Sequence, residues 1–148
     1  MNSAIDTCGY VDIDAKIKRV ADLADMFLLD VKHADESGHI MLTGRPPEKP
    51  RRFLEFLCEK NKRLWIRCVL INGITAEPEY AKMLGNYLKP YGDKIERIEL
   101  LPYHRLGVGK WKKLGLEYKL EGVEPTPRET VENFKKVLRE IVPVKEIV

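Results

Sequence analysis

Acidic and basic side chains follow short apolar runs at several points in this sequence. The clearest case is "FLLDVKH" (27–33), in which Asp30 and Lys32 follow three bulky apolar residues. A run of this kind predicts a buried strand, and side chains two positions apart share one face of a strand. Burial of a charge is costly unless the charge is paired or bound. The pair therefore indicates either a binding site or an internal ion pair.

Three further apolar runs carry a polar or ionisable group at or near their ends. They are "SAIDTCGY" (3–10) with Asp6 and Thr7, "LWIRCVLI" (64–71) with Arg67, and "IERIELLPY" (95–103), which leads to His104. One such residue alone is usually structural and satisfied by a local hydrogen bond. Four strands that deliver polar groups to the same side of a sheet favour a functional site.

Between these runs, apolar residues recur at helical spacing. The expected helices are 12–25, 51–61, 75–88, capped by Thr75, and a last one that starts at a capping box at Thr126. Polar loops are expected up to about Pro50 and after His104. The alternation predicts an α/β fold with parallel strands, either an open doubly wound sheet or part of a β/α barrel. In both, ligands bind at the carboxyl ends of the strands.

The charges at these strand ends suggest two kinds of ligand. Lys32, Arg67 and His104 are basic, whereas Asp6 and Asp30 are acidic. A zwitterionic, amino-acid-like ligand satisfies both groups, and alternatively the two aspartates hold a small cation through hard oxygen ligands. The plainer alternative is an internal Asp30–Arg67 or Asp6–Lys32 ion pair that binds nothing. These residues alone leave the three alternatives open.

Composition predicts one globular domain over residues 1–148. The chain is 44% hydrophobic and 33% charged, and its net charge of +3 does not indicate a basic surface for nucleic acid. No apolar run approaches the ~18 residues of a membrane span, and no secretory signal is visible. Three unclustered cysteines favour a reducing compartment, so we expect a cytoplasmic protein. We expect Cys58 in the core, Cys68 facing the helices, and Cys8 near the strand ends without a partner base.

Other candidate residues are weaker. His33 and His39 lie in a polar stretch and are expected to be solvated. The glycines of "GVGKW" (107–111) lack the spacing and the Ser or Thr of a phosphate-binding loop. Trp111 and Tyr118 either cover a ligand or fix the loop that contains them. No nucleophile–base pair supports an unrelated hydrolase.

Four segments occur together and in order: "AIDTCGYV", "LLDVKHAD", "LWIRCVLINGIT" and "IELLPYHRLGVGKWKKLGLEYKLEGVEP". They resemble the C-terminal part of the glycyl-radical-enzyme activating enzymes, and among these most resemble the activating enzymes of pyruvate formate-lyase. That family belongs to the radical S-adenosylmethionine (SAM) enzymes. The resemblance covers essentially the whole chain. It implies a partial (β/α) TIM barrel of six units, of which this chain resembles the last four.

The resemblance also implies a reaction. A reduced [4Fe–4S] cluster donates an electron to SAM, which cleaves to methionine and a 5′-deoxyadenosyl radical. The radical takes a hydrogen atom from one glycine Cα of the partner, a glycyl radical enzyme such as pyruvate formate-lyase. The residues that match SAM contacts are Lys32, Arg67 and, near the adenosyl part, His104. Those that match ligands of a monovalent cation beside the SAM carboxylate are Asp6, Thr7, Asp30 and the backbone carbonyl of Leu28.

The sequence departs from the family in two places. The Cys-x₃-Cys-x₂-Cys motif that holds the cluster and the segment ending in Gly-Gly-Glu that binds the SAM amino group are both absent. We therefore expect no Fe–S ligands in this chain, a partial SAM site, and no activity of the chain alone. The competing hypothesis is a stand-alone, non-catalytic binding module. Its opened barrel would associate with itself, with the missing N-terminal half or with a glycyl radical enzyme.

Overall fold

The computed structural model describes residues 2–148 and shows an α/β fold built on one parallel sheet. In chain order the elements are β1 (Ala4–Thr7), α1 (Ala15–Leu23), β2 (Met26–Asp30), α2 (Glu36–Thr43), α3 (Glu48–Glu59), β3 (Arg63–Leu70), α4 (Pro78–Leu88), η1 (Lys89–Tyr91), β4 (Ile95–Pro102), η2 (Arg105–Gly107), α5 (Val108–Lys113), α6 (Arg128–Ile141) and β5 (Glu146–Ile147). The five strands lie in the order β1-β2-β3-β4-β5, and each neighbouring pair is parallel. None of the helices in this range is long and apolar enough to cross a membrane.

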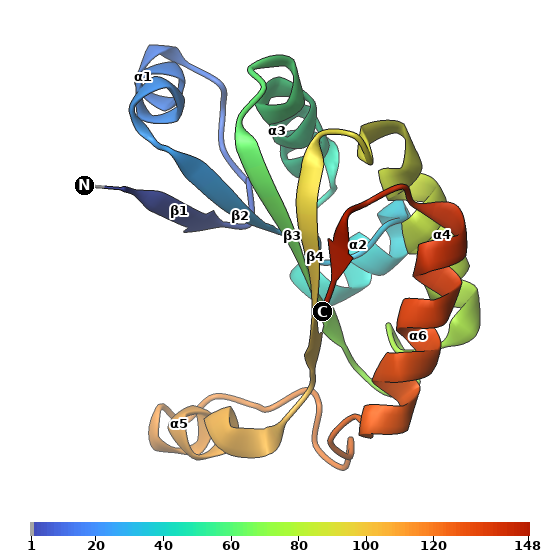
Figure 1. Cartoon of the computed structure of the whole chain (residues 1–148). Coiled ribbons are helices and arrows are strands. Elements are labelled where there is room, and N and C mark those ends of the chain that lie inside the picture. The colour runs from blue at the N-terminus through green and yellow to red at the C-terminus, as the bar shows by residue number, and fades with distance from the viewer. Residues whose placement is uncertain (1) are drawn as a thin grey trace.

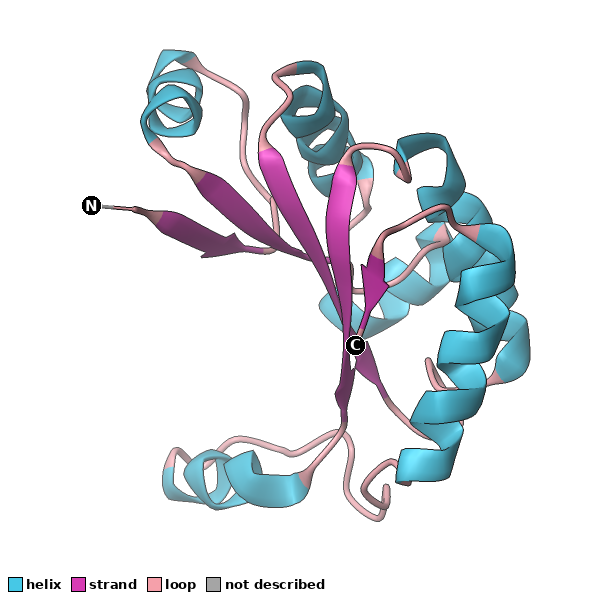
Figure 2. Ribbon diagram, in the orientation of Figure 1, coloured by secondary structure: helices cyan, strands magenta, loops and turns pink. Residues whose placement is uncertain are grey.

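Helices cover one face of the sheet. Figure 1 shows α1, α3, α4 and α6 along the outer side of the fanned strands, while α5 projects from the end of β4 on the opposite side. Figure 2 shows the same strands splaying apart with the second face bare of helices. A parallel sheet normally has both faces covered or closes into a barrel, so this arrangement is an opened one. The expected partial β/α barrel is confirmed.

The alternation of side chains along β3 separates the core from the open face. Buried positions face the helices, and they are Leu64, Ile66, Cys68 and Leu70. The intervening positions face the open side, and they are Arg63, Trp65, Arg67 and Val69. Cys68 therefore faces the helices, as expected from its place beside Arg67. Charged side chains within the strands are confined to the face without helices, where water or a ligand reaches them.

Both predicted threonine caps are wrong. Thr75 Oγ1 donates a hydrogen bond to the Val69 carbonyl at 2.7 Å, and Thr126 Oγ1 donates to the Leu70 carbonyl at 2.6 Å. In the described chain neither α4 nor α6 has a side-chain hydrogen bond at its N-cap, and both helices begin later than expected. The Thr75 hydroxyl instead satisfies the Val69 carbonyl at the carboxyl end of β3, and the Thr126 hydroxyl adds a second hydrogen bond to the Leu70 carbonyl, which also accepts from the Tyr103 amide at 2.9 Å.

The segment before Pro50 is not one polar loop, because it contains α2. The Asp35 carboxylate accepts a hydrogen bond from the Gly38 amide at 2.9 Å and so caps the start of this helix. Gly44 ends it in the left-handed conformation with φ of 70°. The sequence signals for this helix are Asp35 before it and Gly44 after it. Likewise, the stretch after His104 contains η2 and α5.

Candidate functional site

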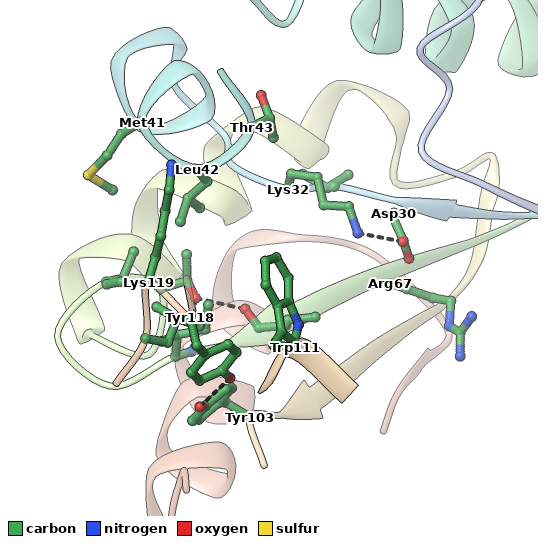
Figure 3. A pocket seen from close by; sticks show the side chains of 16 residues that line it. Asp30, Lys32, Met41, Leu42, Thr43, Arg67, Tyr103, Trp111, Tyr118 and Lys119 are labelled. Carbon is green, nitrogen blue, oxygen red and sulfur yellow. Dashed lines mark hydrogen bonds and ion pairs between the residues drawn. The ribbon is translucent and has the colours of Figure 1, made fainter. Parts of the chain in front are cut away.

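A cavity of about 590 Å³ lies at the carboxyl ends of β2, β3 and β4. Figure 3 shows its lining, in which Asp30, Lys32 and Arg67 lie at one end, and the aromatic and apolar side chains lie at the other together with Lys119. The volume falls within the range of small-molecule sites. The carboxyl ends of parallel strands are where ligands bind in open and barrel-like α/β folds, and the cavity lies at the edge of the sheet where the sequence predicts a site.

Two ion pairs organise the charged end. Lys32 Nζ donates to Asp30 Oδ2 at 2.7 Å, as the dashed line in Figure 3 marks. Arg67 Nη1 donates to Asp6 Oδ2 at 2.6 Å. Internal pairing was one of the sequence alternatives, but the suggested Asp30–Arg67 and Asp6–Lys32 pairs do not form among the described residues. Lys32 pairs with Asp30 instead, and Arg67 pairs with Asp6.

Glu99 is a member of this charged group that the sequence analysis missed. Its Oε2 lies 3.2 Å from Arg67 Nε, and its Oε1 lies 3.7 Å from Arg97 Nη1. The Arg67–Glu99 distance is that of an ion pair, but the geometry does not make a hydrogen bond, and within the described chain the buried Nε has no partner. Arg97 also pairs with Glu146 at 2.7 Å. Ion pairs between opposite charges thus link β1, β3, β4 and β5 across the open face.

The aromatic end is built by the segment that follows β4. The hydroxyls of Tyr103 and Tyr118 lie 2.6 Å apart, and the Trp111 ring meets the Tyr118 ring edge-on at 5.7 Å between centroids. This hydrogen bond raises the pKa of Tyr118 above its usual value. Met41 and Leu42 of α2 add apolar surface from the facing side. Trp111 and Tyr118 therefore line the cavity, and Tyr118 also fixes its loop to the buried Tyr103.

His104 does not line this cavity. It is an exposed residue at the end of β4, where it precedes η2, and the neighbouring Tyr103 takes the place facing the cavity. Successive side chains of an extended strand point to opposite sides, which explains why Tyr103 faces the cavity and His104 does not. The structure thus brings Lys32 and Arg67 together, with His104 at the same strand edge but outside the lining.

The four residues predicted to hold a cation are divided by the sheet. Asp6 is in register with Leu28, and both share the open face with Asp30. The Thr7 side chain points to the other face, where its Oγ1 accepts a hydrogen bond from the Gly9 amide at 3.0 Å. The side chains of Asp6 and Asp30 are therefore on the expected face, and that of Thr7 is not.

The expectation that His33 and His39 are solvated is wrong. The His33 side chain is only 8% exposed, lies 3.1 Å from an oxygen of Asp35, and packs against the Tyr80 ring. His39 is buried in α2, with its Nδ1 2.7 Å from the Arg45 carbonyl. His39 is buried because its segment folds as a helix against the core, and the ring of His33, which precedes that helix, lies between Gly38 and Tyr80. Both rings have structural partners.

The three cysteines lie on separate parts of the fold. Cys8 is exposed after β1, whereas Cys58 of α3 and Cys68 of β3 are buried. Burial raises the pKa of the Cys58 thiol to about 11 and that of Cys68 to about 12. Among residues 2–148, no group of three or more His, Cys, Asp or Glu side chains could hold a metal ion.

The sequence is similar to those of several named proteins. No family model matches the chain. It is 36% identical over 141 residues to the pyruvate formate-lyase 1-activating enzyme of Escherichia coli K12, covering 95% of this chain and 57% of that enzyme. The chain belongs to the pyruvate formate-lyase activating enzyme family. It is also 42% identical over 124 residues to the choline trimethylamine-lyase activating enzyme of Oleidesulfovibrio alaskensis, covering 82% of this chain and 40% of that enzyme.

The chain spans little more than half the length of the Escherichia coli relative and corresponds to the C-terminal part of the family. Its fold matches a domain of pyruvate-formate lyase-activating enzyme from Bacteroides vulgatus, with a TM-score of 0.76, 20% identity, and coverage of 100% of this chain and 81% of that one. It also matches Streptococcus suis SuiB bound to S-adenosylmethionine, with a TM-score of 0.69, 15% identity, and coverage of 100% and 33%. At these identities the matches establish the fold.

Proposed function

We propose that this chain is the C-terminal portion of a pyruvate formate-lyase activating enzyme and supplies part of its SAM site. The main support for this proposal is that charged and aromatic side chains lie at different ends of the cavity. Asp30, Lys32 and Arg67 give one end charges of both signs, and Trp111 and Tyr118 give the other end flat aromatic surface. SAM is divided in the same way, into a charged amino-acid part and an adenosine.

The residues of the cavity fit this cofactor. The Lys32 ammonium has two donors beyond its bond to Asp30, and the Arg67 guanidinium has N–H donors beyond the Nη1 bond to Asp6 and the buried Nε that faces Glu99. Both are suited to a carboxylate. Trp111 and Tyr118 offer faces and edges for stacking on adenine. When bound, SAM supplies the one-electron chemistry of this family, while these residues hold and orient it. His104, just outside the lining, is proposed to approach the adenosyl part.

We extend the proposal to a monovalent cation beside the cofactor. Its ligands would be Asp6, Asp30 and the carbonyl of Leu28, which share the open face, with Thr7 contributing through its backbone because its hydroxyl already accepts from the Gly9 amide. Both carboxylates are paired with basic side chains. Cation binding therefore requires these side chains to turn toward the cofactor, and SAM affinity should rise with the potassium concentration.

The residues do not fit a [4Fe–4S] cluster. Such a cluster needs clustered thiolates, whereas the three cysteines lie on separate elements and two are buried with raised pKa values. We therefore derive no step through a cluster, and we propose that this chain alone does not catalyse the reaction. The partner proposed for the whole protein is a glycyl radical enzyme such as pyruvate formate-lyase. Anaerobic reconstitution with iron and sulfide that gave a stable cluster spectrum would contradict this reading.

Isothermal titration calorimetry with SAM tests the cofactor proposal. The wild-type chain should bind SAM, and Lys32→Met should weaken binding roughly tenfold or more because it removes a charge-assisted hydrogen bond. Lys18→Met is the matched control, since Lys18 is an exposed residue of α1, outside the cavity lining. Its affinity should equal that of the wild type. Undetectable binding, or equal affinity of the wild type and Lys32→Met, would refute the proposal.

The alternative, a non-catalytic binding module, is favoured by one feature. In the described chain β1 forms an edge of the sheet, and the adjoining open face carries no helix. Unpaired strand edges promote association. Sedimentation velocity over a range of concentrations tests this function, which predicts a dimer or larger species. A monomer at every concentration would count against self-association.

A further inference from the structure

A cluster of exposed apolar side chains lies on the segment that follows β4. Its members, with their exposed fractions, are Leu106 (86%), Trp111 (42%), Leu114 (71%) and Leu116 (54%). A single exposed leucine is ordinary, whereas several together mark a contact surface. We call residues 105–116 the α5 surface. Figure 1 shows α5 standing away from the helical layer, on the open side of the sheet.

Four basic residues share the α5 surface: Arg105, Lys110, Lys112 and Lys113. In the part of the chain that the structure describes, none of them forms an ion pair. The last turn of a helix favours lysines through the helix dipole. That effect accounts for the position of the lysines but not for the exposed leucines beside them. The combination predicts a partner with negative charge and apolar side chains.

The α5 surface is continuous with the mouth of the cavity. Trp111 lies on α5 and also lines the cavity, and Tyr118 and Lys119 continue that wall from the adjoining loop. Figure 3 shows Trp111 and Tyr118 side by side at the aromatic end. Anything that docks on the α5 surface would therefore lie at the entrance to the site.

We propose that the α5 surface docks an acidic, leucine-bearing segment of the partner protein. The proposal rests on the proposed function, which requires a second polypeptide to reach the mouth of the cavity. An anionic membrane is the other conceivable occupant. A membrane-bound amphipathic helix presents a long apolar face, whereas α5 has six residues and its tryptophan faces a cavity. These features favour a protein segment.

Fluorescence anisotropy tests the docking surface with a fluorescein-labelled synthetic peptide rich in glutamate and leucine. A triple variant, Lys110→Glu, Lys112→Glu and Lys113→Glu, should bind roughly tenfold or more weakly and lose most of the salt dependence. The matched control reverses three exposed charges of α1, at Lys16, Lys18 and Arg19. That control should bind the peptide like the wild type.

A second pair of variants tests the apolar contribution. Leu114→Ser should weaken peptide binding several-fold, whereas Leu23→Ser on α1 should not, although both leucines are 71% exposed. Circular dichroism confirms that each variant is folded. Equal peptide binding by the two members of either pair would overturn the proposal. So would equal binding of a lysine–leucine peptide, or binding to phosphatidylglycerol vesicles without binding to the acidic peptide.

Calorimetry on the same variants separates this proposal from the proposed function. Lys110, Lys112 and Lys113 do not line the cavity, so their reversal should leave SAM affinity unchanged. Peptide binding that depends on these lysines in a chain that binds no SAM would refute the proposed function and support the docking surface. SAM binding without peptide binding would refute the docking surface alone.

Discussion

Arg67 of β3 reaches Asp6 of β1 across the intervening strand β2, with 2.6 Å between Nη1 and Oδ2. The strand register places Arg67 opposite Asp30 and Asp6 opposite Leu28, so the contact runs diagonally over β2. On its other side the same guanidinium faces Glu99. Arg67 is therefore the residue that joins the charges of β1 to those of β4.

Glu99 should matter more for stability than Asp6, although it is the more distant partner. The Glu99 side chain is 18% exposed and faces two arginines, whereas that of Asp6 is 61% exposed. Glu99→Gln leaves both arginines under-compensated in a partly buried place and should lower the free energy of unfolding by about 1–3 kcal/mol. Asp6→Asn removes a solvent-screened pair and should cost about 0–1 kcal/mol. Urea unfolding measures both, and a larger loss from Asp6→Asn would show that contact distance outweighs burial here.

The strands and the site edge could be predicted from sequence because both depend on local pattern. The run that contains Arg67 is short, apolar and rich in β-branched residues, and polar groups at successive strand ends meet by topology alone. The ion-pair partners could not be predicted in the same way. Which side chains face each other depends on strand register and twist, so Glu99 was missed and the partners of Asp6 and Lys32 were exchanged.

Local signals were also outweighed by tertiary contacts. Thr126 has the sequence of a cap, but its hydroxyl donates instead to the Leu70 carbonyl at the end of β3, which also accepts from the Tyr103 amide. His39 lies in a polar segment, yet it is buried because that segment folds as α2, and the ring of His33, which precedes this helix, packs against Gly38 of α2 and against Tyr80. Whether such a residue is buried depends on which elements pack against its helix, and the sequence of a single segment does not show this.

The Tyr103–Tyr118 hydrogen bond should hold the aromatic wall of the cavity in place. Tyr118→Phe leaves the hydroxyl of the buried Tyr103 without its partner at 2.6 Å. We expect a loss of about 1 kcal/mol in the free energy of unfolding and faster proteolysis within residues 104–125. The double variant Tyr103→Phe/Tyr118→Phe should recover part of the loss, because it removes both polar groups. Unchanged proteolysis of Tyr118→Phe would mean that Trp111 packing alone fixes this loop.

Thr126 should contribute to stability through its hydrogen bond to β3 rather than as a helix cap. Thr126→Val keeps the shape of the side chain but removes the hydroxyl that donates to the Leu70 carbonyl at 2.6 Å, while the Tyr103 amide still donates to that carbonyl, so the free energy of unfolding should fall by about 0.5–1.5 kcal/mol. Thr126→Ser keeps the donor and should lose less. Chemical denaturation of the pair distinguishes the two roles. A residue acting through helix capping would instead reduce the helicity of α6 in both the valine variant and an isolated peptide.

The cap of α2 should make its contribution in a defined pH range. Hydrogen bonds from the Gly38 amide and the Ser37 hydroxyl hold the pKa of Asp35 below its usual 3.8. A depressed pKa means that the stabilisation is fully present above the unfolded value and is lost as pH falls through the folded value. Asp35→Ala should therefore cost about 0.5–2 kcal/mol at pH 7 and progressively less below pH 3.8. Thermal unfolding across this range measures the difference, and a loss independent of pH would point to side-chain packing instead.

Only one thiol should react at neutral pH in the folded chain. Cys8 is exposed, whereas burial raises the pKa of Cys58 to about 11 and that of Cys68 to about 12, so these two are neither accessible nor ionised. Titration with an aromatic disulfide reagent should show one fast thiol in the native chain and three after denaturation in urea. Cys8→Ser should remove the fast phase and leave two thiols that react only on unfolding. Fast reaction of a second thiol in native Cys8→Ser would show that α3 opens locally to expose Cys58, because Cys68 lies beneath the helices on a central strand.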